Sequence, residues 1–492
     1  MMQKVIVFFV FIVTAITSCN AQSEAYLKNI NAVLQSFEGD TALQHASWGF
    51  CLISDKDGKI ISSNNEKRSL QPASTTKVLT TSAALSILGS DYTFKTRLAY
   101  KGKITKQGVL LGDVYVIGGG DPSIGFNRIK GVKNDKELID AFEYVLRKAG
   151  INTIQGSIIA DATYFERAMQ PNAWAWDDIA NYYGAGPSGL NFRENQYNLY
   201  LKQSKTPGEP CAYVCTYPLI PGLQCYSEIV SGAKGSGDEG YIYGASYSNL
   251  RYLRGKIPPG DTLFCIKGSL PDPALICAQL LAGRMTNGKV TPKATTVYLL
   301  QEQNNMPDTN SRTILLSIAS PPLKELVKYT NIYSINLYAE TLLKEIGKKV
   351  NGKGSTEEGL RVLKQFWLNK GIDLSGLFLL DGSGLSRYDA ITAEQFAQAI
   401  HAMRSEKAFA DFYLSLSVAG QFGALSSIGK GTVADGNIHA KSGYMTRVRS
   451  YAGYVRNKEG KEFSFAFIIN NYSESAYSVK MKIEKLLIAL AE

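Results

Sequence analysis

Alternating apolar and polar side chains mark residues 45–62. This period of two, on either side of the turn sequence DKDG at 55–58, predicts a β-hairpin. The next apolar stretch, residues 78–88, has helical character and ends at Gly89, a residue that commonly terminates helices. A hairpin followed by a helix is therefore expected near the start of the chain.

The middle of the chain, from about 93 to 310, shows a different pattern. Short apolar runs with β character alternate with loops rich in Gly and Pro. We expect strands over residues 110–117, 154–159 and 262–266, with loops at 232–240 and 258–260. This section is predicted to form inserted domains rather than one continuous core.

A helical period returns after Ser334, where apolar residues recur on one face. We expect one helix to begin near Leu337 and others to cover residues 353–368, 392–403 and 476–490. Two strands are predicted at 449–456 and 462–470, joined by a turn. With a hairpin near the start and strands near the end, the pattern predicts one α/β (α+β) domain assembled from both ends of the chain.

Composition narrows the class of protein. Of the 492 residues, 45% are hydrophobic and 20% charged; these values exclude general disorder, a coiled coil and a collagen-like fibre. The length predicts about two to four domains. The net charge is +10, but the basic residues form no dense block, so no nucleic-acid partner is expected.

The first 21 residues have the pattern of a secretory signal: a lysine, an apolar stretch, and then small and polar residues. The apolar stretch is shorter than the roughly 20 residues that a membrane crossing needs. The end of the signal is open to two interpretations. The sequence ITSC resembles a lipobox, which would make Cys19 a lipid anchor, whereas cleavage after Ala21 would release a soluble protein. Both predict a periplasmic location.

Cysteine and histidine positions bear on disulfides and metals. Of the six cysteines beyond the signal, four lie between 211 and 265, so one or two disulfides are expected there, with pairing left open. The three histidines are far apart and no HExxH motif occurs. A zinc hydrolase is therefore disfavoured, and we expect no metal and no cofactor.

Ser74 and Lys77 form an S-x-x-K motif at the start of the predicted helix. Residues three apart share a helix face, so the amine can reach the hydroxyl and act as the base that activates it. The alternative is an N-terminal cap serine with a surface lysine. Two further matches, at 231–234 and 427–430, lie in turns rich in Gly and Ser without a following helix.

Two later motifs carry complementary groups. Ser334 and Asn336 form S-x-N before a predicted helix, where a hydroxyl can relay a proton and a carboxamide can bind an amide. Lys441, Ser442 and Gly443 form K-S-G at the entry to the last strands, and suit a substrate carboxylate. The alternatives are a helix cap for the first motif and a strand-entry turn with an exposed lysine for the second.

The order of the three motifs resembles the signature set of penicillin-binding proteins and serine β-lactamases. Further stretches extend the resemblance to the low-molecular-mass class C penicillin-binding proteins, the D-alanyl-D-alanine carboxypeptidase/endopeptidase family (peptidase family S13). These stretches are GGGDPS at 118–123, YYGAGPS at 182–188, DGSGLSR at 381–387 and HAKSG at 439–443. The long separation of Ser74 from Ser334 also fits this family.

The resemblance implies a D,D-peptidase-like transpeptidase domain, with an antiparallel sheet and helices, that carries two inserted smaller domains. The implied division is a signal at 1–21, a penicillin-binding domain at 22–92 and 312–492, an inserted domain at 93–121 and 196–311, and another at 122–195.

The resemblance also implies roles for the motif residues. Ser74 would be the acylated nucleophile and Lys77 its base, while Ser334 would relay the proton to the leaving amine and Asn336 would bind the substrate amide. Arg387, which follows the Asp-Gly-Ser-Gly sequence, would face the substrate side chain.

The same resemblance implies that Lys441 and Ser442 bind the substrate carboxylate beside Gly443. The backbone N–H groups of Ser74 and Tyr444 would form the oxyanion hole. Ser442 is a departure, because the family usually has threonine there, but serine keeps the hydroxyl.

The implied activity is hydrolysis of peptidoglycan stem peptides through an acyl-enzyme, with β-lactams as covalent inhibitors. One alternative is a serine β-lactamase, which the long insertion and the GGGDPS stretch disfavour. Another is a wall-binding protein with a vestigial site.

Overall fold

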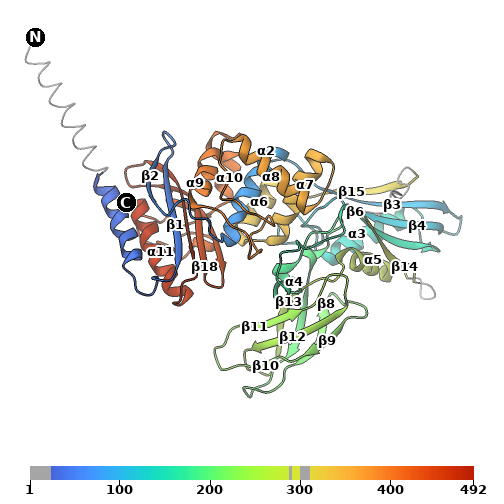
Figure 1. Ribbon diagram of the computed structural model, residues 1–492. Helices are drawn as coiled ribbons and strands as arrows, with labels where there is room; N and C mark the ends of the chain where they lie inside the picture. Colours follow the sequence, from blue (N-terminus) through green and yellow to red (C-terminus); the bar gives the residue numbers. More distant parts are fainter. Residues whose placement is uncertain (1–23, 287–290, 300–310) are drawn as a thin grey trace, which may run out of the picture.

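A computed structural model describes residues 24–286, 291–299 and 311–492 (Figure 1). The predicted secretory signal and the predicted anchor at Cys19 lie outside these residues. Among the helices of the described ranges, none combines the length and the apolar character needed to cross a membrane.

A six-stranded antiparallel sheet takes its strands from both ends of the chain. Across the sheet these are β16 (Ser417–Val418), β17 (Ile438–Met445), β18 (Val448–Arg456), β19 (Glu462–Asn470), β1 (Ser47–Ser54) and β2 (Ile60–Asn64). The predicted hairpin is β1–β2, and the two strands predicted near the C-terminus are β18 and β19. The mixed α/β fold class, with an antiparallel sheet and helices, is confirmed.

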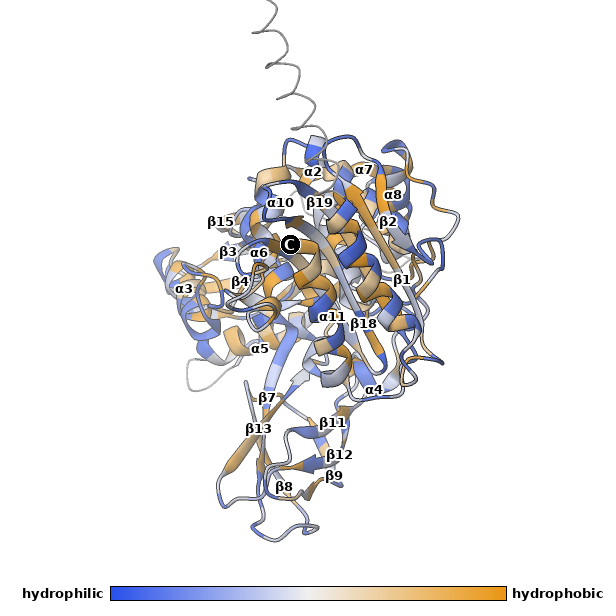
Figure 2. Ribbon diagram, turned by 90° about the vertical axis from the view of Figure 1, so that its left-hand side faces the viewer, coloured by the Kyte–Doolittle hydropathy of each residue, from blue (hydrophilic) through white to orange (hydrophobic). Residues whose placement is uncertain are grey.

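Both faces of this sheet are covered by helices. Successive side chains of a strand point to opposite faces, so neighbouring residues of one strand pack in different clusters. Phe467 of β19 packs in one cluster with α11 (Ala476–Ala491) and a helix over residues 24–38, whereas Ile468 packs in another with α9 (Ala393–Ala402). Figure 2 shows polar and apolar segments together on α11, as expected for a helix with one side on the sheet.

The remaining helices of this part of the chain pack on the α9 side of the sheet. They are α2 (Lys77–Leu88), α6 (Leu323–Tyr333), α7 (Asn336–Asn351), α8 (Thr356–Asn369) and α10 (Phe409–Ser415). The predictions of α2, α7, α8, α9 and α11 are confirmed within a few residues. The hydrophobic pattern did not predict α6, α10 or the helix over 24–38.

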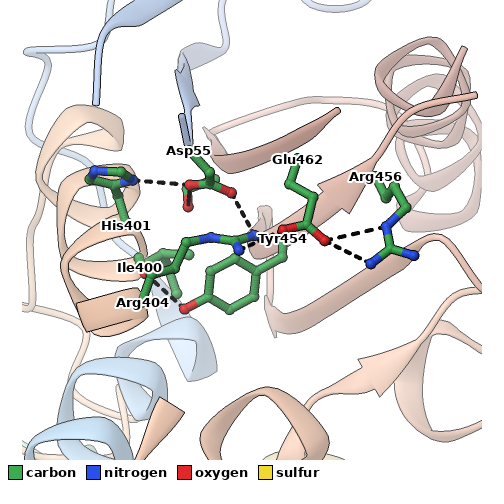
Figure 3. A network of polar contacts seen from close by, with 8 residues as sticks. Asp55, Ile400, His401, Arg404, Tyr454, Arg456 and Glu462 are labelled. Atoms are coloured by element: carbon green, nitrogen blue, oxygen red, sulfur yellow. Dashed lines mark hydrogen bonds and ion pairs between the residues drawn. The ribbon is translucent and has the colours of Figure 1, made fainter. Parts of the chain in front are cut away.

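A polar network ties the β1–β2 turn to the helical layer (Figure 3). The side chain of Asp55 is 4% exposed, and its carboxylate lies 3.0 Å from His401 Nδ1 and 2.7 Å from the Arg404 guanidinium. Arg404 also lies 2.7 Å from Glu462 on β19, and the Tyr454 hydroxyl donates to the carbonyl of Ile400 at 2.7 Å. These contacts fix the end of α9 against the sheet.

The middle of the chain forms a mixed sheet and a separate β-rich lobe. The mixed sheet has the order β14 (Lys293–Leu299), β6 (Ser157–Glu166), β4 (Val109–Ile117), β3 (Lys95–Ile104) and β15 (Thr313–Ala319), with β5 (Thr153–Ile154) beside β4. It packs with α3 (Asp135–Lys148) and α5 (Pro273–Arg284). The hydrophobic pattern predicts strands and loops here and indicates neither helix.

The β-rich lobe contains two small sheets. One has the order β13 (Leu263–Ser269), β7 (Gln196–Lys202) and β8 (Ala212–Tyr217); the other has β10 (Val230–Ser231), β12 (Leu250–Ile257) and β11 (Glu239–Tyr243), with β9 (Gln224–Ser227) also paired to β12. The mixed sheet combines β3 and β4 with β6, although the predicted boundaries place β6 in a different inserted domain from β3 and β4. The division into domains stays a prediction.

The expected disulfides are not formed. Within the described part of the chain, all six cysteines beyond the predicted signal are unpaired. Cys215 and Cys265 lie opposite the same residue, Tyr200, but on the two strands that flank β7, so a strand separates them. The expectation of one or two bridges between 211 and 265 is wrong.

Candidate active site

Ser74 lies on a sharp turn at the start of the first helix after the hairpin. A short 3-10 helix, η1 (Ala73–Thr76), runs directly into α2. Ala73 has a φ of 49°, a left-handed conformation that is uncommon for a residue with a side chain. The half-buried Ser74 side chain is thereby presented at the helix start, as the sequence predicts.

Gly443 lets β17 approach this turn closely. A Cβ atom at position 443 would lie 2.6 Å from the Pro72 carbonyl oxygen and 3.0 Å from the Thr75 backbone nitrogen. Those distances are too short for a side chain, so the position requires glycine. The strand that carries K-S-G is therefore packed directly against the turn that carries Ser74.

The Lys77 amine is fully buried among three oxygen atoms. Its Nζ lies 2.9 Å from Ser74 Oγ, 2.6 Å from Asn336 Oδ1 and 2.7 Å from the carbonyl oxygen of Ser383. The contact with Ser74 is the one that the spacing of three predicts. The alternative of a surface lysine is wrong.

This arrangement suits a lysine that acts as a base. Asn336 Oδ1 and the Ser383 carbonyl can only accept hydrogen bonds, so they engage two N–H groups of the amine. The remaining direction points to Ser74 Oγ. In the neutral amine that direction is the lone pair, which can accept the hydroxyl proton.

Burial lowers the pKa of Lys77 to about 7, although the carboxylates of Asp381 and Glu340 oppose this shift. Glu340 is itself fully buried, and burial together with the Asp381 carboxylate raises its pKa to about 8. At neutral pH a large fraction of Lys77 is therefore neutral.

Ser334 and Asn336 lie at the junction of α6 and α7. Ser334 ends α6 in a left-handed conformation, with a φ of 57°, and Asn336 is the first residue of α7. The carboxamide of Asn336 accepts from Lys77 and donates from Nδ2 to the carbonyl oxygen of Tyr183 at 2.8 Å. Asn336 thus connects α2 to a segment from the middle of the chain. Ser334 does not cap α7, so the cap alternative is wrong.

Lys441 on β17 is buried, which excludes the alternative of an exposed strand-entry lysine. Its Nζ donates to Ser334 Oγ at 3.0 Å and to the carbonyl oxygen of Ser442 at 2.6 Å. Burial, and then the nearby Lys77 charge, lower the pKa of Lys441 well below its ordinary value. The structure therefore brings the lysines of the first and third motifs close together.

A cavity of about 1370 Å³ opens beside these groups. Its lining includes the predicted residues Ser74, Ser334, Asn336, Arg387 and Tyr444. Its other wall comes from the middle of the chain, and includes Asp177, Asp178, Tyr182, Tyr183, Tyr241, Tyr243 and Lys267. Three segments distant in sequence thus meet in one crevice.

Arg387 and Tyr444 line this cavity, whereas Lys77, Lys441, Ser442 and Gly443 are not part of its lining. The Arg387 guanidinium is half-exposed and paired with Asp177 at 3.0 Å and Asp178 at 3.5 Å. Tyr444 is exposed, whereas Ser442 is half-buried between Lys441 and Gly443. Arg387 is therefore beside the cavity but already engaged by acidic side chains.

Asp381 fixes the loop that supplies the Ser383 carbonyl to Lys77. Its buried carboxylate accepts the backbone N–H groups of Gly384 at 2.6 Å and Ser386 at 2.7 Å, and Nε1–H of Trp174 at 2.8 Å. Trp174 comes from the middle of the chain and is 5% exposed. One side chain of the middle section therefore supports the base through this loop.

We expect Trp174→Phe to lower the free energy of unfolding by about 1.5–3 kcal/mol, because it removes a hydrogen bond to a buried carboxylate. Urea denaturation measures the change. The control is Trp176→Phe, at a position that is 54% exposed, where the expected change is within about 0.5 kcal/mol. Equal changes in the two variants would contradict this role of the Trp174–Asp381 contact.

Glu340 and Trp174 were not among the residues predicted from the sequence. A signal for Glu340 was present: Asn336, Glu340 and Lys344 recur every four residues along α7, and all three are buried. No local pattern indicates Trp174, because its partner Asp381 lies 207 positions away.

Comparison with known proteins agrees with this geometry. The family described as D-Ala-D-Ala carboxypeptidase 3 (S13) matches residues 28–489. A D-alanyl-D-alanine carboxypeptidase of Actinomadura sp. (strain R39) is 28% identical over 464 residues, which cover 91% of this chain and 81% of the relative. The D-alanyl-D-alanine carboxypeptidase DacB of Haemophilus influenzae is 24% identical, over 88% of this chain and 87% of the relative.

Solved structures show the same fold. The crystal structure of penicillin binding protein 4 (dacB) from Haemophilus influenzae matches with a TM-score of 0.74 and 22% identity, over 91% of this chain and 97% of that one. The same protein complexed with a β-lactam matches with a TM-score of 0.70 and 21% identity, over 90% of this chain and 96% of that one.

Proposed function

The chain belongs to the D-Ala-D-Ala carboxypeptidase 3 (S13) family, and on that premise we propose that it is a serine-type D-alanyl-D-alanine carboxypeptidase/endopeptidase that cleaves peptidoglycan stem peptides. The observation that carries the proposal is the buried Lys77 amine, 2.9 Å from the Ser74 hydroxyl at the edge of a large cavity. A serine beside a neutral amine is an activated nucleophile.

Acylation begins when neutral Lys77 accepts the Ser74 proton and Oγ attacks the carbonyl carbon between the two D-alanines. The oxyanion that forms is stabilised by the backbone N–H groups of Ser74 and Tyr444. Collapse of this intermediate breaks the peptide bond. The proton passes through Ser334 to the leaving amine, and water then hydrolyses the ester.

Substrate binding uses the groups around this centre. The terminal carboxylate binds Lys441 and Ser442 beside Gly443, and the Asn336 carboxamide binds the substrate amide. The hydrogen bond from Lys441 to Ser334, at 3.0 Å, supports a shared role of the two motifs. Arg387 lies further out and would face the side chain of the stem peptide.

β-Lactams would acylate the same serine, since the Haemophilus influenzae relative has been solved in complex with one. The alternatives are a serine β-lactamase and a wall-binding protein with a vestigial site. The set of intact contacts around Lys77 argues against the vestigial site.

The place of action is the periplasm in this proposal. The support is the signal pattern of residues 1–21 and a substrate that lies outside the cytoplasm. Two alternatives for the mature protein stay open: a lipid anchor at Cys19, or a soluble form after cleavage behind Ala21.

Two measurements test the activity. Mass spectrometry of the intact secreted protein after benzylpenicillin is expected to show one covalent adduct, together with the mature N-terminus and any lipid. Release of D-alanine from a D-Ala-D-Ala peptide is expected to exceed hydrolysis of nitrocefin. Rapid nitrocefin turnover without D-alanine release would favour the β-lactamase, and no adduct would favour the vestigial site.

A further inference from the structure

The solvent side of the sheet formed by β9, β12 and β11 carries a group of aromatic side chains. In Figure 1 these strands lie in the β-rich lobe with α4 (Trp176–Ile179) next to β11. We call the side chains of Trp176, Tyr226, Tyr241, Tyr243 and Tyr252 the aromatic face. Four of them are 37–56% exposed, although such large apolar groups are usually covered.

Strand register places three of these rings in one row. Tyr226 of β9 and Tyr243 of β11 both pair with Tyr252 of β12, and paired residues point to the same side of a sheet. The rings of Tyr226 and Tyr252 stack with centroids 5.8 Å apart and an angle of 27°. Trp176 extends the row, since its ring lies 5.0 Å from that of Tyr243.

The row meets the active-site cavity at Tyr243, which lies between Tyr252 and Trp176. Tyr243 and its neighbour Tyr241 line the same cavity as Ser74, whereas Tyr226 and Tyr252 lie outside it. A ligand that lies along the row would therefore reach the cavity at Tyr243. This continuity relates the aromatic face to the reaction at Ser74.

Charged side chains between the rings limit which kind of ligand can bind the aromatic face. Arg254 lies next to Tyr252 along β12, over the ring of Tyr243 at 5.6 Å, and donates to Glu228 at 2.8 Å. Lys256 and Glu239 face each other in the next register pair. These two cations and two anions balance on the strands, so this part of the face suits a neutral, polar ligand rather than an anionic one.

We infer that the aromatic face binds the glycan strand, a neutral polymer of N-acetylated amino sugars, from which the stem peptide at Ser74 extends. The inference rests on the proposed function for its substrate. The apolar C–H face of a sugar ring packs against an aromatic ring, and the tyrosine hydroxyls can bond to sugar hydroxyls and amides. A dry protein interface would have to bury the Arg254–Glu228 pair, which costs free energy.

The test uses the full-length Ser74→Ala protein and insoluble chitin, a bare glycan of uncharged N-acetylglucosamine units that carries no stem peptide. Co-sedimentation with this bare glycan is expected, and adding Tyr226→Ser and Tyr252→Ser should weaken it about 10-fold, or roughly 1.4 kcal/mol. The matched control carries Tyr144→Ser and Tyr477→Ser, which are 65% and 70% exposed elsewhere, and should bind as the parent does. Equal binding by both double variants, or binding only to glycan that retains its peptides, would overturn the inference.

A second readout uses Ser74 intact. The Tyr226→Ser/Tyr252→Ser enzyme should release D-alanine from a short soluble peptide at the parent rate, because neither residue lines the cavity. Its rate on peptides attached to glycan should fall about 10-fold. An equal fall on both substrates would mean a general defect and would contradict the inference. If the parent cleaved neither substrate, the proposed function would fail, while the sedimentation result would still decide the glycan site.

Discussion

Ser74→Ala is expected to abolish covalent labelling by benzylpenicillin, with a fall of at least about 10³-fold in the acylation rate. The hydroxyl of Ser74 is the group that Lys77 contacts at 2.9 Å within the cavity. Alanine removes the atom that forms the covalent bond. Fluorescent penicillin, followed by gel electrophoresis, measures the loss.

The fold of the Ser74→Ala variant should be retained. Ser74 is half-buried, and Lys77 keeps its two other partners, Asn336 and the Ser383 carbonyl. The matched control is Ser427→Ala, which alters another S-x-x-K match whose exposed serine accepts from Lys480 on α11. Labelling that survived in Ser74→Ala and was lost in Ser427→Ala would assign the nucleophile to Ser427.

Local patterns predicted those parts of the site that local geometry controls. The spacing of Ser74 and Lys77 predicts their contact because residues three apart on a helix are neighbours, and the structure places the two groups 2.9 Å apart. The alternation at 45–62 likewise predicts β1–β2. The relation of the three motifs, in contrast, came from the resemblance to a family and not from spacing.

Long-range pairing explains what the patterns missed. β6 pairs in parallel with both β4 and β14, and nothing in a single strand indicates which distant strand lies beside it. The helix α3 was missed for another reason. Its capping box, Asn134 with Glu137, and its amphipathic spacing were available in the sequence but lay within a region dominated by glycine and β-like runs.

The buried environment of Lys77 also depends on tertiary contacts. Asp381 and Glu340 approach it from a loop and a helix far along the chain, and their carboxylates act against the burial that lowers its pKa. Sequence alone indicates that a lysine needs a lowered pKa to act as a base. It does not show which groups set that pKa.

Lys77→Ala is expected to slow benzylpenicillin acylation by about 10²–10⁴-fold, the usual contribution of a general base. An ordinary lysine, with a pKa of about 10.4, would be less than roughly 0.1% neutral at pH 7. Burial lowers the pKa of Lys77 to about 7, so about half of it is neutral at that pH. The second-order acylation rate of the variant and of the parent, measured by stopped flow, checks the prediction.

The pH dependence of the acylation rate also tests whether Lys77 is the base. Because the neutral amine is the base, the acylation rate of the parent should rise as the pH increases through about 7, the pKa of Lys77. Lys77→Ala should lose this rise and still fold, because it removes a buried cation without leaving a charge in its place, and Glu340 keeps the backbone N–H of Gly382 at 3.0 Å. In this variant the Asp381 carboxylate keeps its hydrogen bonds from the N–H groups of Gly384, Ser386 and Trp174. A parent rate that did not change between pH 6 and 8, or a folded variant with the parent's rate and profile, would show that another group accepts the Ser74 proton.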